Sequence, residues 1–595
     1  MLNSQIDLRW WLLDNLTKLE HPQEFYRLFA TIFFAIFLFF SLMPFLLAKA
    51  RENNLKRLLL SDAIFTLFLS LFILAARWPG LLAPVLNPDE ALFTSGAMKL
   101  MKDPVFWRSL ETGSSGPLNI YPLMLPALFG FRLEYAASRV IGLLLITLSV
   151  ICLYYALRYL YGKAIARLAA MPVAACVALM IHPDYIHYTG EHVSIAILSI
   201  ALLMLCKYYV NGSSSVKWPV FWFGFTAGLV PYAKLQAMPV AFILSCIFLH
   251  IIWIKQKAKE RVSRSFFILL GGALVFSGFV LLYLVIFSLQ EVFWRSYIQE
   301  SLFYLNTNSS KSLFDKFLIY LPYARWIKDT SSFFMVAIII SIFGLPFLFL
   351  RRKQAPLNKR QEDTFVFVYY SLAFLIVSIY STIAPGRGFG HHLLFLIIPS
   401  GFLIGVFLAE PYKILQAQES IRRNFKLSLA AAVIVAIITG SCTEFYSIIR
   451  KGNIFIAYRK YFAANYPDPI AKAILKHAPT GGSLLVWGWA PELYVDTGLI
   501  QATKSGNLFY EIEPNPRQPY FLKEFSGLFM NSKPDIFVDA VAPGMFFFHD
   551  RKTGGFDAFP EVAGIVNKYY TLADEVQGVR IFVRKPIKKD GANSG

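Results

Sequence analysis

Charged residues are scarce in this chain of 595 residues. Only 16% of them are Asp, Glu, Lys or Arg, whereas 56% are hydrophobic, and the mean hydropathy is +0.52. Soluble domains carry roughly 25% charged residues. The composition therefore excludes an ordinary soluble protein of this length and indicates an integral membrane protein.

Signatures of several soluble enzyme classes are also missing. No Gly-rich phosphate loop or Walker pattern is present, which argues against an enzyme that holds a nucleotide-sugar diphosphate. The five cysteines, Cys152, Cys176, Cys206, Cys246 and Cys442, show no metal-ligand spacing. We therefore expect no metal cofactor, although a divalent ion remains possible.

What the chain does contain is a series of long apolar runs, each close to the roughly 18 to 20 residues that span a bilayer as helix. They lie near 28–48, 59–77, 137–157, 165–181, 193–210, 218–233, 238–254, 266–288, 332–350, 364–384, 391–409 and 427–447. The first run is long and lacks a small-residue cleavage site, so we expect a retained helix and not a signal peptide. The fold class predicted is a polytopic α-helical membrane protein of about twelve spans.

Lys and Arg cluster in alternate connections between these runs. The clusters lie at 49–57, 158–167, 207–217, 255–264, 351–360 and 413–426. The positive-inside rule assigns them to the cytoplasm and places both termini outside. Much of the net charge of +20 is then topological, and no nucleic-acid partner is expected.

Three sizeable regions would face away from the cytoplasm: 78–136, 289–331 and the chain after 448. In the last, "SLLVWGWAPELYV", "PDIFVDA" and "VRIFVRK" are typical of strands. We predict a transmembrane catalytic domain over 1–448, a small extracytoplasmic α/β domain over 449–588 and a disordered tail over 589–595. The segment 289–331 mixes aromatic and charged residues and suits an amphipathic stretch at the membrane interface.

Acids and bases gather at the outer ends of four spans. They are Asp89 and Glu90 in "NPDEALF"; Glu191 in "HPDYIHYTGEH", with His182, Asp184, His187 and His192; Lys234 in "GLVPYAKLQAMP"; and Arg387, His391 and His392 in "APGRGFGHH". Each has an ordinary structural explanation, such as a helix start that carboxylates favour or a lysine that reaches the headgroups. Ionisable groups at membrane depth are costly, however, and four such sites at one leaflet together indicate function.

Acids and cations at an outer membrane surface fit the chemistry of a polyprenyl-phosphate sugar donor. The lipid tail lies in the bilayer, the phosphate at headgroup level and the sugar just outside. A carboxylate there can accept the proton of an attacking hydroxyl, and Lys or Arg can stabilise the departing phosphate. Because that phosphate is a weak base, the reaction needs no general acid.

Several motifs resemble one enzyme class. "PDEALF" in the first external loop, "GPLNIYPLMLPALFG" and "ASRVIGLLL" are similar to motifs of GT-C membrane glycosyltransferases, specifically the bacterial relatives of protein O-mannosyltransferases and of the lipid A aminoarabinose transferase, as in glycosyltransferase family 39. "GLVPYAKLQAMP", "GRGFGHHLLFLIIPSGFLIG" and "VWGWAPELYVDTG" resemble later stretches of the same class. The run at 28–48 is an additional N-terminal helix by this comparison, and the usual "PP" after the loop helix is "GPLN" here.

The resemblance implies a GT-C fold in the cytoplasmic (inner) membrane and an inverting hexosyl- or pentosyltransferase. It makes Asp89 the general base or the carboxylate that orients the acceptor, with Glu90 tuning the charge of Asp89 or holding the acceptor. Donor and acceptor contacts fall to Glu191, Lys234, Arg387, His391 and His392. The acceptor is a glycan, a lipid or a protein. Two alternatives stay open: a flippase of lipid-linked sugars, and an assembly protein with an inactive transferase fold.

Overall fold

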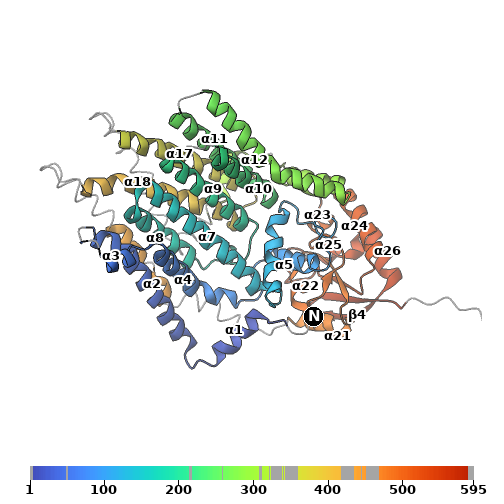
Figure 1. Ribbon diagram of the computed structural model, residues 1–595. Helices are drawn as coiled ribbons and strands as arrows, with labels where there is room; N and C mark the ends of the chain where they lie inside the picture. The colour runs from blue at the N-terminus through green and yellow to red at the C-terminus, as the bar shows by residue number, and fades with distance from the viewer. Residues whose placement is uncertain are drawn as a thin grey trace, which may run out of the picture.

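The computed structural model (Figure 1) describes residues 5–48, 51, 53–212, 217–256, 259–306, 311–320, 322, 338–339, 341, 359–416, 435–443, 445–450 and 468–586. Helices before the C-terminal domain are α1 (Leu8–Thr17), α2 (Pro22–Leu46), α3 (Asn54–Leu59), α4 (Asp62–Leu81), α5 (Pro88–Leu100), α6 (Leu125–Leu128), α7 (Tyr135–Tyr161), α8 (Lys163–Leu179), α9 (Glu191–Asn211), α10 (Lys217–Ala233), α11 (Met238–Gln256), α12 (Lys259–Ile286), α13 (Gln290–Phe293), α14 (Glu300–Asn306), α15 (Leu313–Leu318), α17 (Lys359–Ile383) and α18 (Ile397–Gln416).

Eight of the helical segments described are long and apolar enough to cross a membrane. They are Pro22–Leu46, Asp62–Leu81, Tyr135–Tyr161, Glu191–Asn211, Leu235–Lys255, Val262–Ile286, Phe365–Ile383 and Gly390–Ala409. The chain is thus a polytopic helical protein. Two further expected spans correspond to α8 and α10, whose 17 residues rise only about 26 Å. The expected span 332–350 lies largely outside the described residues and 427–447 lies partly outside them, so a count of twelve stays a prediction.

Glycines let two of the long helices approach closely. A Cβ at Gly224 of α10 would lie 2.1 Å from the carbonyl oxygen of Leu269 in α12, and one at Gly228 would lie 2.3 Å from that of Ala273. In the other direction, a Cβ at Gly272 would lie 2.2 Å from the carbonyl oxygen of Phe221. Because lipid gives no hydrophobic drive for helix association, such small-residue contacts hold membrane helices together.

The C-terminal domain is an α/β unit, as the sequence predicts. Its elements are α21 (Pro469–His477), β1 (Ser483–Trp487), α22 (Glu492–Thr497), β2 (Ile500–Gln501), α23 (Phe509–Ile512), α24 (Gln518–Ser532), β3 (Ile536–Asp539), α25 (Arg551–Gly554), α26 (Pro560–Tyr569), β4 (Tyr570–Val576) and β5 (Val579–Arg584). The sheet order is β2-β1-β3-β5-β4, with β2, β1 and β3 parallel and β5 antiparallel to both β3 and β4.

Both faces of this sheet are covered. Side chains of β1 alternate between two cores: Leu484 and Val486 pack in one with α21 and α22, and Leu485 and Trp487 pack in the other with α24 and α26. Central strands of parallel sheets are buried on both faces in this way. The expected strands are confirmed at β1, β3 and β5, but the "ELYV" part of the first stretch forms helix α22 instead.

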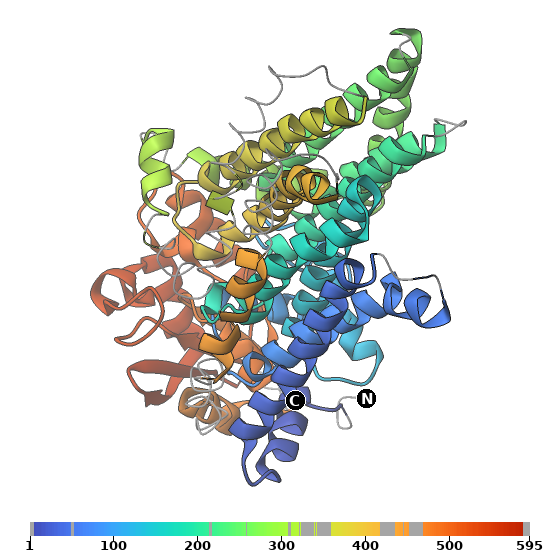
Figure 2. The same ribbon diagram turned by 90° about the vertical axis from the view of Figure 1, so that its left-hand side faces the viewer.

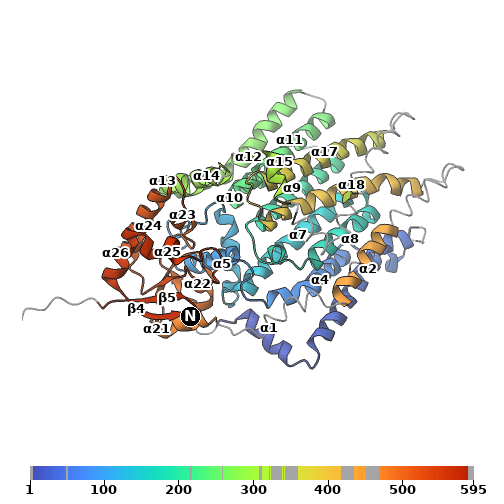
Figure 3. The same cartoon turned by 180° about the vertical axis from the view of Figure 1, so that it is seen from behind.

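The C-terminal domain lies at one end of the helix bundle, and α3 lies at the other (Figures 1, 2 and 3). The domain docks onto the loop between α4 and α7. Lys99 of α5 donates to the carbonyl oxygens of residues 501 to 503, and Arg132 donates to that of Val495. The connection 78–136 and the C-terminal domain therefore share one end of the bundle. The predicted boundaries of the domains stay predictions, and residues 451–467 lie outside the described chain.

The side of the membrane on which this end lies is a prediction from the Lys and Arg clusters. A reporter enzyme that works only outside the cytoplasm should be active when it is fused after residue 460, because the cationic loops orient the spans. The matched control is the same reporter fused within the connection 158–167, where it should be inactive. A cytoplasmic reporter at residue 460 would reverse the orientation.

Candidate functional site

The acidic pair opens helix α5, which the sequence predicts. Asn87 is the N-cap and accepts from the backbone N–H of Asp89 at 2.9 Å, while Pro88 occupies the first helical position. Carboxylates in a first turn complement the helix dipole. Because successive residues of a helix point about 100° apart, the two acids of the pair leave the helix in different directions.

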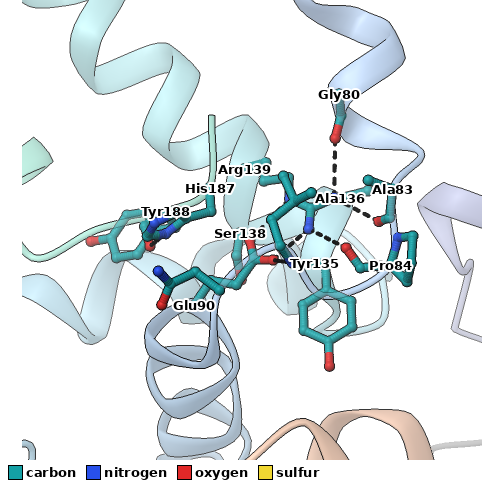
Figure 4. A network of polar contacts seen from close by, with 12 residues as sticks. Gly80, Ala83, Pro84, Glu90, Tyr135, Ala136, Ser138, Arg139, His187 and Tyr188 are labelled. Carbon is teal, nitrogen blue, oxygen red and sulfur yellow. Dashed lines mark hydrogen bonds and ion pairs between the residues drawn. The ribbon is translucent and has the colours of Figure 1, made fainter. Parts of the chain in front are cut away.

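Glu90 is fully buried and belongs to a network that ties three segments together (Figure 4). Its carboxylate accepts two N–H groups of Arg139 in α7 and the backbone N–H of Leu86. The same guanidinium donates to the carbonyl oxygens of Gly80, Ala83 and Pro84. The network thus fixes the end of α4, the start of α5 and α7 relative to one another. The sequence leads us to expect that Glu90 tunes the charge of Asp89 or holds the acceptor. In the structure, its carboxylate is instead engaged by Arg139.

Asp89 is instead part of the lining of a cavity of about 500 Å³ between the bundle and the C-terminal domain. This volume is in the range of small-molecule sites. Within the described chain, no hydrogen bond or ion pair engages the Asp89 side chain. A half-buried carboxylate that no cation neutralises is free to accept a proton from a molecule in the cavity.

Glu191 and Lys234 form a buried ion pair in the wall of the same cavity. Glu191 begins α9, and Lys234 follows the end of α10 in extended backbone, where it bridges to Ser115 of the connection 78–136. Gly116 permits this approach, because a Cβ there would lie 2.1 Å from the carbonyl oxygen of Tyr232. His392 Nε2 lies 3.8 Å from Glu191 Oε1. One oxygen of Glu191, Oε2, has no hydrogen-bond partner within the part of the chain that the structure describes.

Arg387 is the second cation of the cavity wall. Its guanidinium lies over the ring of Tyr304, 4.6 Å from the centroid, and no hydrogen bond or ion pair to it occurs among the described residues. His391 stacks on Phe389 nearby, with 5.6 Å between ring centroids. An arginine held by an aromatic ring with its N–H groups unused presents a planar fork of donors that suits phosphate.

Asp184 also lines the cavity, and His187 lies beside it. Asp184 accepts from the Asn87 side chain at 3.2 Å and lies 3.7 Å from His187 Nε2. Burial raises the pKa of Asp184, but His187 and His391 outweigh it and hold the pKa below the usual range. Burial lowers the pKa of His187, yet Asp184 and Glu90 raise it above the ordinary value.

Two groups of three side chains have the geometry to hold a metal ion, and both include His391. One is Asp184, His187 and His391, and the other is Glu191, His391 and His392; in each group the ligand atoms lie within 4.8 Å of one another. In the second group, Lys234 already supplies a cation to Glu191. The expectation that no metal is required stays a prediction.

The structure gathers most of the residues singled out from sequence. The cavity lining includes Asp89, Glu191, Lys234, Arg387, His391 and His392, which come from four distant stretches of the chain, but not Glu90. It also includes residues that sequence reasoning did not select, such as Tyr304, Asn87 and a group of side chains from the C-terminal domain. Asn87 had a usable signal, since it precedes Pro88 as an N-cap would. The other residues had no signal in the sequence, because only the fold brings them to the cavity.

One solved structure shares the fold. No family model matches the sequence, and no curated protein matches it. The structure of ArnT from Cupriavidus metallidurans bound to undecaprenyl phosphate matches with a TM-score of 0.54 at 12% identity, over 87% of this chain and 97% of that one. The apo form of the same protein gives 0.48 at 13% identity over 88% and 98%. The Archaeoglobus fulgidus oligosaccharyltransferase in the apo form gives 0.42 at 11% identity over 89% and 75%. The first match shows that the chain has the GT-C fold, as the sequence motifs suggest.

Proposed function

We propose that this protein is a membrane glycosyltransferase that moves a sugar from a polyprenyl-phosphate donor to an acceptor on the outer face of the cytoplasmic membrane. The observation that carries the proposal is the cavity in which Asp89, whose carboxylate has no partner among the described residues, lies with the cations Lys234 and Arg387. A structure with the same fold holds undecaprenyl phosphate, which supports a lipid-phosphate donor.

The reaction is a single displacement at the anomeric carbon of the donor sugar. The acceptor hydroxyl oxygen forms the new bond to that carbon while Asp89 accepts the hydroxyl proton. The bond from the anomeric carbon to the phosphate oxygen breaks, and its electron pair leaves with the polyprenyl phosphate. Lys234 and Arg387 stabilise the charge that develops on the phosphate. Attack opposite the leaving group inverts the anomeric configuration.

Glu191 orients Lys234 in this scheme. The ion pair holds the ammonium in one place, and the second oxygen of Glu191, which is buried, has no hydrogen-bond partner among the described residues. His391 and His392 lie beside it and can donate to the donor phosphate or sugar.

Arg387→Gln tests the donor site. A charge-assisted contact to phosphate is worth on the order of 1.5 to 3 kcal/mol, so the variant should use donor about 10- to 150-fold less well. Since Arg387 has no ion pair to lose within the described residues, the fold should be unaffected. The measurement is the binding of undecaprenyl phosphate and the dependence of transfer on donor concentration.

Lys234→Gln is the matched comparison. It removes the same charge but also leaves buried Glu191 without its cation, so we expect both weaker donor binding and a lower melting temperature. If both variants bind the donor as well as the wild type does, Lys234 and Arg387 have only a structural role at the headgroups. That result would contradict their assignment to the donor site.

A further inference from the structure

The C-terminal domain supplies one wall of the cavity, and that wall is aromatic. Trp489, which follows β1, packs against Phe509 and Phe546, with 5.4 Å between ring centroids in each case, and against Phe547 at 5.6 Å. All four line the cavity. Phe546 and Phe547 keep 52% and 42% of their surface exposed. These two rings therefore offer open faces.

Carboxylates line the same part of the cavity. They are Glu111, Glu300, Glu511 and Glu524, and they come from the first external loop, α14, α23 and α24. Lys504 pairs with Glu111 and with Glu524, so one cation faces four acids. Glu511 is only 9% exposed, and within the described residues no side chain or neighbouring backbone group donates to its carboxylate. Burial raises the pKa of Glu511 to about 8.

We propose that this end of the cavity is the acceptor subsite, and that the acceptor it takes is a sugar residue of a glycan that carries no negative charge. The inference rests on the proposed function and names the acceptor class that the sequence leaves open. Trp489 and its aromatic neighbours form the surface on which the sugar ring stacks, and Glu511 and Glu300 take hydrogens from its hydroxyl or amino groups.

The chemistry of the wall favours this class over the others. The C–H groups of a sugar ring pack against aromatic faces. Carboxyl groups accept hydrogen bonds from hydroxyls, and from ammonium groups more strongly. A phosphate or carboxylate on the acceptor would instead meet Glu111 and Glu524, which share Lys504 as their cation, and like charges repel in a partly dry site.

The charges also orient the two substrates. Asp89, Lys234 and Arg387 belong to the helix bundle, whereas the aromatic wall belongs to the C-terminal domain. In this proposal the donor phosphate binds at the bundle, and the acceptor hydroxyl approaches Asp89 from the side of the C-terminal domain.

The test is a binding measurement on the purified full-length protein in lipid nanodiscs, with an array of bacterial surface oligosaccharides that includes neutral, amine-bearing and acidic members. We expect neutral or amine-bearing oligosaccharides to bind and acidic ones to bind at least tenfold more weakly. Trp489→Ala should weaken that binding about tenfold, and Glu524→Gln, which removes one of the two carboxylates paired with Lys504, should reduce the discrimination against acidic members. Both variants should bind undecaprenyl phosphate as the wild type does.

Leu572→Ala is the matched control, since Leu572 is 51% exposed on β4 and does not line the cavity. Acidic oligosaccharides that bind as well as neutral ones, sugar binding unchanged in Trp489→Ala, or no oligosaccharide bound by the wild type would each overturn the proposal. Failure of the proposed function has a different outcome: sugars and undecaprenyl phosphate bind as expected, but no sugar is transferred.

Discussion

Asp89→Asn should lower the rate of sugar transfer by about 10² to 10⁴ while leaving the protein folded and able to bind donor lipid. Asparagine keeps the size of the side chain but cannot accept the acceptor proton. The Asp89 side chain has no partner to lose within the described residues, so the change removes basicity and little else. The assay is transfer from a purified polyprenyl-phosphate sugar in detergent, with donor binding measured on the same sample.

The same variant separates the competing functions. A flippase moves a lipid headgroup without removing a proton and should tolerate Asp89→Asn. If Asp89 serves only as a favourable residue at the start of α5, the change should cost about 1 kcal/mol of stability or less and leave the rate nearly unchanged. Full transferase activity would therefore exclude the general-base role, and loss of donor binding together with activity would show a structural role.

Much of the membrane domain follows from the sequence because the physical constraint is strong. A run of apolar residues in lipid must be helical to satisfy its own backbone, and the expected run 137–157 accordingly lies within α7. Helix α5 was predictable for a local reason, since Asn87 and Pro88 form a typical start. The C-terminal strands were visible as short apolar stretches, although β2, with two residues, is too short to leave a signal.

The two adjacent acids show where sequence reasoning stops. Asp89 and Glu90 are neighbours in the chain, and nothing local distinguishes them. The difference arises from Arg139, which lies 49 residues away from Glu90 on α7 and engages one acid only. Arg139 could be mistaken for an ordinary residue near the outer end of a span. Tertiary contacts at such distances set the role of each acid, and the aromatic wall around Trp489 is hidden from the sequence for the same reason.

Replacing Glu90 should therefore lower mainly the stability of the protein, whereas its position beside Asp89 suggests a direct effect on the reaction. Removing one partner of a buried ion pair typically costs 3 to 5 kcal/mol, because the other charge stays buried without compensation. Glu90→Gln keeps one acceptor oxygen, and Arg139 keeps its three carbonyl partners, so we expect a loss near the lower end, about 3 kcal/mol. Arg139→Met should cost more, since it leaves a buried carboxylate and three carbonyl oxygens without donors.

A double-mutant cycle in detergent measures this network. The unfolding free energies of Glu90→Gln, Arg139→Met and the double variant are compared, and the double variant should lose clearly less than the two single losses added, because the interaction can be lost only once. Glu291→Gln is the matched control: its pair with Arg295 is exposed, at 71% and 51%, and should contribute no more than about 0.5 kcal/mol. Turnover should fall in both single variants through displacement of Asp89, in step with the loss of stability. Stability equal to the wild type in Glu90→Gln, with turnover reduced, would contradict the structural role and return Glu90 to the reaction itself.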